Sequence, residues 1–339
     1  MSVRWHLEEL GGYPVHTFMA EDDLEDDDLK EDADFLATLA AAAPAPESVA
    51  WKIATHFDAT WEFADVFGAF LKTVDTTKVR ALVIGYFATD ILDGADGVVP
   101  VLVEHAGKFP ALQHLFVGDI VGEEHEISWI PPEDVTPLLE AFPGLVGFGY
   151  RFGTGHGEAA GPILRPVAHA NLRRLAFQTG GMPAHLPAAV AASDLPALER
   201  LELWLGVEMY GGTVAVADLA GLLDGTRLPA LRHLGLMNSE IQDEVASAVA
   251  VAPVVAQLES LDLSMGMLSD AGAEALLSGQ PLTHLARLSV RHHFLSEPAA
   301  KRLADSLAAS GVAVDVSERC TPWDGARTPE EGRYTEVSE

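Results

Sequence analysis

The sequence predicts an α/β leucine-rich repeat solenoid, a horseshoe with parallel strands on its concave face and helices on its convex face. The first observation is a recurring L-x-x-L-x-L segment, in which Val can replace the last Leu. Self-similarity of this kind is typical of stacked repeats. The clear copies begin at Leu112, Leu198, Leu231, Leu258 and Leu285. Weaker copies begin at Val79, Leu145 and Leu172.

The second observation is the spacing, because successive copies begin 33, 33, 27, 26, 33, 27 and 27 residues apart. About 27 residues allow a strand, a turn and a returning helix. The third observation is the helical pattern after two strands, in LSDAGAEALLSG and LSEPAAKRLADSLAASG. Ser269 and Ser296 are expected N-caps of these helices. One strand–helix unit cannot bury its apolar face alone, so neighbouring units must stack.

Residues 258–277 carry the pattern LxxLxLxxxxLSDAGAEALL, which resembles the ribonuclease-inhibitor-like leucine-rich repeats. The resemblance extends over residues 79–316 and implies the horseshoe fold. This subtype usually carries Asn or Cys at one position of each repeat, where its buried side-chain ladder forms. Here Ser239, Gly266 and His293 stand at that position, so the ladder is not expected in its usual form.

The segments ESVAWKI, EISWI and ELWLG are similar to those of a bacterial leucine-rich repeat family. That resemblance implies no known biochemical activity. The family is associated with gene neighbourhoods that contain radical-SAM-type enzymes. An accessory subunit of a peptide- or small-molecule-modifying enzyme system is therefore an alternative function.

The pattern divides the chain into four parts. Residues 1–47 are expected to be an acidic, partly disordered segment, because residues 21–34 contain ten carboxylates and one lysine. Residues 48–78 contain an alternating stretch and a helical stretch, which predict an N-terminal capping unit. Residues 79–316 form the repeat array. Residues 317–339 are a polar tail that we expect to be mobile, although RYTEV could dock as a strand.

Composition restricts the class of function. The 339 residues include 51 acidic and 21 basic side chains, a net charge of −30, which disfavours nucleic acid and anionic membranes. A single cysteine, Cys320, excludes an internal disulfide. No apolar run reaches the ~18 residues of a membrane span. The first residues lack the features of a secretory signal, so the cytoplasm is the expected compartment.

Side chains between the leucines are expected to point outward from the concave face. Five arginines and two histidines stand there, beside aromatic residues, a composition that binding surfaces favour. Alternatively, these arginines pair with Glu202, Asp262 and nearby acids and keep the face soluble. The candidate partner-binding residues on this face are His114, Phe116, Arg151, Arg174, Arg200, Trp204, His233, Arg287 and Arg291.

Long connections that follow the strands are a second candidate surface. Extra residues occur in 85–97, 118–134 and 204–213, and a loop at 153–158 joins them. All are expected at one edge of the horseshoe, where loops commonly carry recognition. His125, Trp129, His156 and Tyr210 are the candidates there. Alternatively, Trp129 simply covers the core.

Motifs for catalysis and cofactors are weak. The GHGEAA stretch fits G-x-G-x-x-A, but Gly161 and Pro162 oppose the helix that a dinucleotide site needs. Neighbouring His292 and His293 on a strand would face opposite sides. We therefore expect a non-catalytic module that binds a protein or peptide, with acidic partners among the candidates, and with no cofactor and no metal. A metal-dependent enzyme that uses the 123–129 loop is the remaining alternative.

Overall fold

The strands follow one another across a single sheet in the order in which they occur along the chain. The computed structural model describes residues 3–87, 97–154 and 161–339. Within these residues the sheet has twelve strands, of which only β1 and β2 pair antiparallel. The strands are β1 (Glu9–Leu10), β2 (Tyr13–Thr17), β3 (Ala50–Ile53), β4 (Ala81–Ile84), β5 (His114–Val117), β6 (Gly147–Arg151), β7 (Arg174–Gln178), β8 (Arg200–Gly206), β9 (His233–Ser239), β10 (Ser260–Asp262), β11 (Arg287–Ser289) and β12 (Ala313–Asp315).

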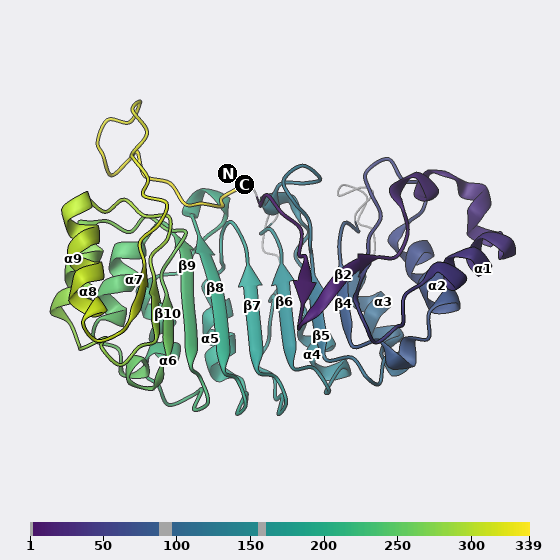
Figure 1. Ribbon diagram of the computed structural model, residues 1–339, viewed down its shortest axis with the longest axis horizontal. Helices are drawn as coiled ribbons and strands as arrows, with labels where there is room; N and C mark the ends of the chain where they lie inside the picture. The colour runs from purple at the N-terminus through teal and green to yellow at the C-terminus, as the bar shows by residue number, and fades with distance from the viewer. Residues whose placement is uncertain (1–2, 88–96, 155–160) are drawn as a thin grey trace.

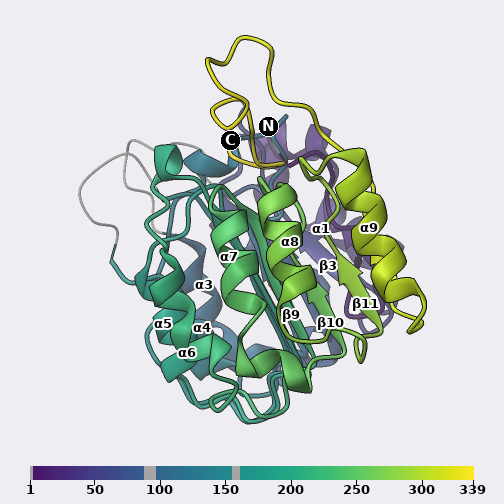
Figure 2. The ribbon, with the colours of Figure 1, turned by 90° about the vertical axis from the view of Figure 1, so that its left-hand side faces the viewer.

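The helices cover one face of this sheet and leave the other face without helices, as two perpendicular views show (Figures 1 and 2). We call the second surface the helix-free face. Short 3-10 helices fill several of the connections between strands. The α-helices are α1 (Ala33–Ala42), α2 (Phe63–Thr73), α3 (Val98–Glu104), α4 (Thr136–Ala141), α5 (His185–Ala192), α6 (Ala220–Leu223), α7 (Gln242–Val249), α8 (Asp270–Ser278) and α9 (Glu297–Ala308).

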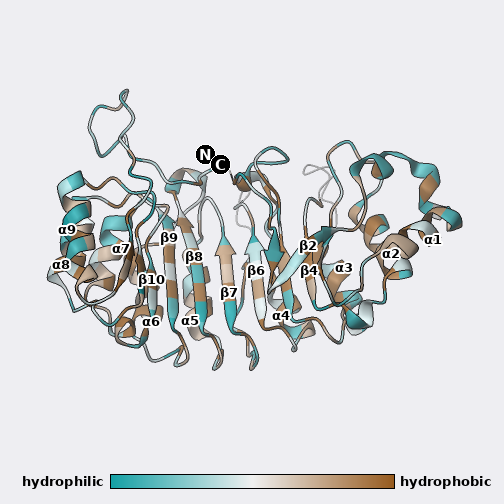
Figure 3. Cartoon of the chain, in the orientation of Figure 1, coloured by the Kyte–Doolittle hydropathy of each residue, from teal (hydrophilic) through white to brown (hydrophobic). Residues whose placement is uncertain are grey.

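The register of the strands stacks one leucine on the next. Leu201, Leu234 and Leu261 are direct partners on β8, β9 and β10, and each is at most 1% exposed. Hydrophobic residues alternate with hydrophilic ones along β8 and β9 (Figure 3). The leucines of both strands therefore point toward the helices, and the residues between them point toward the helix-free face. The prediction that the segments at Leu198, Leu231 and Leu258 form neighbouring parallel strands is confirmed.

The predicted helix starts are also confirmed. The Ser269 hydroxyl accepts a hydrogen bond from Ala271 N at the start of α8, and the Ser296 hydroxyl accepts one from Ala299 N at the start of α9. These bonds satisfy backbone donors that have no partner inside the helix. Leu276 and Leu303 then point into the core.

The N-terminal segment differs from expectation. The acidic stretch is not a loop, because it forms the 3-10 helices η1 (Glu21–Glu25) and η2 (Asp27–Glu31) and leads into α1. Leu24 is 2% exposed in the main core, and the Trp61 indole donates a hydrogen bond to Asp26 O. Lys30 Nζ also lies 2.9 Å from Asp65 Oδ2 on α2, and Trp61 N donates to Leu24 O. These contacts together hold the acidic stretch against the α2 end of the sheet, away from the arginines of the helix-free face (Figure 1).

The residues before this stretch cover part of the helix-free face. Strand β2 joins the sheet beside β3, and β1 folds back across β4 and β5. Leu7, Leu10, Tyr13 and Val15 pack there on Ala50, Ala81 and Val83. Gly11, with φ of 64°, lies so close to the His114 ring that a Cβ atom would clash with it. The helix-free face is therefore exposed mainly from β7 onward.

Candidate binding site between the two chain ends

The structure separates the predicted residues of the helix-free face into covered and accessible ones. Phe116, Arg151 and His233 are buried, contrary to expectation, and His114 lies half-buried under the β1–β2 turn. Sequence reasoning missed the N-terminal cover over His114 and its neighbours because it placed the first 47 residues outside the sheet, whereas His233 on β9 is buried among its own strand neighbours. The accessible or half-buried members are Arg174, Arg200, Trp204, Arg287 and Arg291.

Acidic neighbours neutralise several of these arginines, as the alternative interpretation predicted. Arg200 Nη2 lies 2.5 Å from Glu202 Oε1, and Arg287 Nη2 lies 3.0 Å from Asp315 Oδ2. Exposed pairs of this kind cost little to separate. The Arg174 guanidinium has neither an ion pair nor a hydrogen bond among the described residues. These three side chains remain available to a partner.

His233 is held by its strand neighbours. Its Nδ1 lies 2.7 Å from Ser260 Oγ, and its Nε2 lies 3.3 Å from Glu202 Oε1 without the geometry of a hydrogen bond. Burial alone would raise the pKa of Glu202. The hydrogen bonds and charges of His233 and Arg200 have a larger opposite effect, so the pKa of Glu202 is lowered overall. His233 therefore has a structural role, because it connects polar side chains of β8 and β10, and we do not expect it to bind a ligand.

A buried ion cluster fastens the N-terminal segment to the sheet. The Asp119 side chain, which is 0% exposed, accepts hydrogen bonds from Lys52 Nζ (3.0 Å) and Leu7 N (3.1 Å). Arg151 Nη1 lies 3.8 Å from Asp119 Oδ1 and donates a hydrogen bond to Ile120 O. The Arg151 guanidinium also lies over the Phe116 ring. Burial would raise the pKa of Asp119, yet His6, Lys52 and Arg151 lower it to about 2.

His6 completes this cluster from the N-terminal segment. Its Nδ1 lies 3.2 Å from Asp119 Oδ2, and its Nε2 lies 3.4 Å from Glu124 Oε1. Hydrogen bonds to Asp119 and then Glu124 raise its pKa to about 9, against the opposing effects of burial and of Lys52. His6 therefore contacts two carboxylates, and its Nδ1 also lies 2.8 Å from Lys52 Nζ, so these contacts hold residues 3–7 in place.

This arrangement gives a pH-dependent contribution to stability. The pKa of His6 is higher in the folded protein than the 6.5 of the unfolded chain, so its contribution is complete below pH 6.5. The contribution should disappear as the pH rises from 6.5 to about 9. We expect the difference in unfolding free energy between wild type and His6→Gln to shrink over that interval in urea titrations. A difference that grows with pH would contradict the assignment.

The C-terminal tail docks on the sheet instead of remaining mobile, and it docks without forming a strand. Asn238 Nδ2 donates to Val337 O (2.5 Å), and Val337 N donates to Asn238 Oδ1 (2.9 Å). Glu336 N donates to Met265 O, and the Glu336 carboxylate pairs with Arg291. The two ends of the chain consequently meet above the middle of the sheet (Figure 1).

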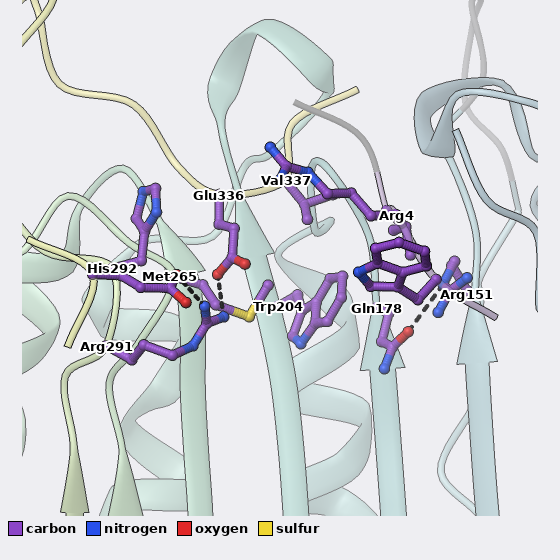
Figure 4. Close-up of a pocket in the computed structure, with 12 residues that line it drawn as sticks. Arg4, Arg151, Gln178, Trp204, Met265, Arg291, His292, Glu336 and Val337 are labelled. Carbon is purple, nitrogen blue, oxygen red and sulfur yellow. Dashed lines mark hydrogen bonds and ion pairs between the residues drawn. The ribbon is translucent and has the colours of Figure 1, made fainter. Parts of the chain in front are cut away.

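The two docked ends enclose a pocket of about 560 Å³ on the helix-free face. Arg151, Gln178 and Trp204 rise from β6, β7 and β8 toward it (Figure 4). Arg151 Nε donates to Gln178 Oε1 at 3.0 Å, which fixes both polar groups. The other lining residues come from the N-terminal segment before β1, the loops after β10 and β11, and the tail: Val3, Arg4, Trp5, Met265, Arg291, His292, Glu318, Glu336 and Val337.

Solved structures supply the comparison that decides the family. A Bacteroides fragilis protein determined by the Northeast Structural Genomics Consortium matches with a TM-score of 0.72 and 30% sequence identity. The match covers 85% of this chain and 77% of the Bacteroides chain. This chain belongs to the Bacteroides protein's family. No protein-family model and no curated protein matches the sequence.

In this member of the Bacteroides protein's family, the loops that follow β5, β6 and β8 contain a second group of candidate binding residues. Trp129 is 43% exposed, and its indole donates to Glu126 Oε2. Thr154 Oγ1 donates to Tyr210 O (2.6 Å), and a hydrogen bond to Glu339 raises the pKa of Tyr210 to about 12. The loops after β6 and β8 therefore meet each other and the chain end. Most of 85–97 and 153–158, including His156, lies outside the described residues.

The 123–129 loop is occupied by structural contacts. Glu124 accepts a hydrogen bond from Val121 N and contacts His6, while Glu126 accepts from Trp129. His125 packs between the rings of Tyr86 and Trp129, and burial lowers its pKa. These contacts give no support to a metal-dependent site in the loop.

Another group of potential metal ligands lies at the pocket. His292, Glu318 and Glu336 bring one ligand atom each within 4.8 Å of one another. Arg291 pairs with both carboxylates, and the His292 ring nitrogens contact Tyr334 O (3.2 Å) and Cys320 Sγ (3.5 Å). A cation would have to displace the arginine, so this cluster is better explained as an anchor of the tail.

Proposed function

We propose that this protein is a leucine-rich repeat solenoid of the ribonuclease-inhibitor-like type that binds a protein or peptide without catalysing a reaction. The repeated leucines, the ordered parallel strands and the helices on one face support the repeat assignment. The partner would lie along the helix-free face from β7 to β11, where the sheet is not covered by the N-terminal segment.

The pocket between the chain ends is the observation that carries this proposal. It combines two tryptophans with arginine side chains, the residue types that dominate binding energy at interfaces. Its volume of about 560 Å³ lies within the range of ~300–1,000 Å³ typical of ligand pockets. None of the described helices is long and apolar enough to cross a membrane.

The exposed arginine column gives a direct test. Peptides selected from a random display library on the wild-type protein should lose binding to the triple variant Arg174→Glu, Arg200→Glu and Arg287→Glu. Each lost charge-assisted contact is worth ~1.5–3 kcal/mol, so the affinity measured by isothermal titration should fall by more than about a hundredfold. Binding should also weaken with salt, because exposed charges are screened.

Matched charge reversals on the helical face provide the control. Lys72, Lys301 and Arg302 are exposed on α2 and α9, and their replacement by Glu should leave peptide affinity unchanged. Both triple variants should keep the wild-type melting temperature within a few degrees, since exposed ion pairs contribute ~0–1 kcal/mol. Full affinity in the first triple variant would contradict binding on the helix-free face.

A further inference from the structure

The pocket between the chain ends has walls of opposite charge. Its first wall contains Arg151 and Gln178, and the buried Asp119 carboxylate lies behind Arg151 without lining the pocket. Asp119 is the counter-charge of both Lys52, at 3.0 Å, and Arg151, at 3.8 Å. Two positive charges and one negative charge leave one positive charge in excess. Because Arg151 is only 3% exposed and lines the pocket, this excess faces the cavity from a poorly hydrated position.

Arg151 is also rigidly positioned. Its Nε donates to Gln178 Oε1 (3.0 Å), its Nη1 donates to Ile120 O (2.7 Å), and its plane lies over the Phe116 ring. A guanidinium fixed in this way loses little conformational entropy when it binds a carboxylate. The Gln178 side chain lies beside it on β7 and adds an amide group to the same wall.

The opposite wall carries a negative excess. Arg291 pairs with two carboxylates, Glu318 and Glu336, so one positive charge meets two negative ones. Both glutamates are partly exposed, at 56% and 29% of their side chains. A second acidic group of a ligand would be repelled there, whereas an ammonium group would be attracted.

Two tryptophans stand between these walls. Trp204 rises from β8 and is half-buried (Figure 4), while Trp5 of the N-terminal segment also lines the pocket and is 83% exposed. A large indole left in water at the rim of a pocket gains contact area when an apolar group enters. The two indoles thus add apolar surface to the pocket that Arg151 lines.

We propose that this pocket binds a peptide carboxylate together with its adjoining apolar or aromatic side chain. The carboxylate would contact Arg151, the side chain would lie against Trp5 and Trp204, and the rest of the peptide would extend toward Glu318 and Glu336. The inference rests on the proposed peptide-binding function and names the chemical group that the site recognises. A C-terminal residue and an internal acidic side chain are two sources of the same group.

Isothermal titration with four defined peptides tests the inference on the full-length protein. The probes are Ala-Ala-Phe with a free C-terminus, the same tripeptide as its amide, Ala-Ala-Ala with a free C-terminus, and the amide of Ala-Glu-Phe. Loss of the carboxylate should weaken binding by about tenfold or more, since a charge-assisted contact is removed. Loss of the ring should also weaken binding by about tenfold. Tight binding of the Ala-Glu-Phe amide would identify an internal acid as the source of the carboxylate, and weak binding would identify the C-terminus.

Trp5→Ala locates the site, because this exposed side chain can be removed without disturbing the core. It should weaken binding of Ala-Ala-Phe by about tenfold while the melting temperature stays unchanged. Trp323→Ala is the matched control, since Trp323 is 69% exposed in the tail and does not line the pocket. Its affinity should equal that of the wild type.

Three results would overturn the inference. The first is equal affinity for the free and amidated Ala-Ala-Phe peptides together with no tighter binding of the Ala-Glu-Phe amide. The second is an unchanged affinity of Trp5→Ala. The third is no heat from any of the four peptides at millimolar concentration while display-selected peptides still bind and still depend on the arginine column. That third outcome would leave the proposed function standing and remove only the carboxylate pocket.

Discussion

Replacing Asp119 with alanine should lower the free energy of unfolding by about 3–5 kcal/mol, because the change leaves buried cations without their counter-charge. Lys52 and Arg151 have side chains only 8% and 4% exposed, so water cannot replace the carboxylate. The same substitution removes the acceptor of Leu7 N and one partner of His6. Urea denaturation monitored by circular dichroism measures the loss.

An exposed ion pair serves as the control for this substitution. Asp305 pairs with Lys301 on α9 at 63% exposure, and Asp305→Ala should cost less than about 1 kcal/mol. If Asp119→Ala were as mild as Asp305→Ala, the buried cluster would not hold the N-terminal segment on the sheet.

Leu234→Ala and Leu261→Ala should each destabilise the protein by about 2–5 kcal/mol, the range for a fully buried leucine that leaves a cavity. The two side chains are register partners on β9 and β10, at 0% and 1% exposure. Val251→Ala is the apolar control, because Val251 is 75% exposed and should contribute almost nothing. Losses below about 1 kcal/mol at both leucines would show that the strand register is wrong.

The repeat region could be predicted from the sequence because its signal is periodic and local. Each strand contains its own leucines, and each of the helices α8 and α9 begins at a serine three to four residues before its first inward side chain. The alternation of Val312, Val314 and Val316 indicates β12 in the same local way. Nothing beyond the immediate neighbours in the chain is needed for these elements.

The site could not be predicted in the same way, because contacts between distant residues build it. Asp119 and Leu7 are 112 residues apart, and Asn238 and Val337 are 99 residues apart. The short segment from Leu7 to Leu10, with two glutamates between its leucines, has no period that would place it on β4 and β5. The arginine at position 151 was recognised as a candidate, but its burial depends on that unpredicted cover.

Hydrogen exchange of the protein bound to a display-selected peptide tests the central claim most directly, since it locates the binding surface without substitutions. Binding on the helix-free face predicts slower backbone exchange in residues 3–7, in the C-terminal halves of β7 and β8, and in residues 334–338. Exchange in α7, α8 and α9 should stay unchanged. Protection confined to those helices, with residues 3–7 and 334–338 unaffected, would contradict the account.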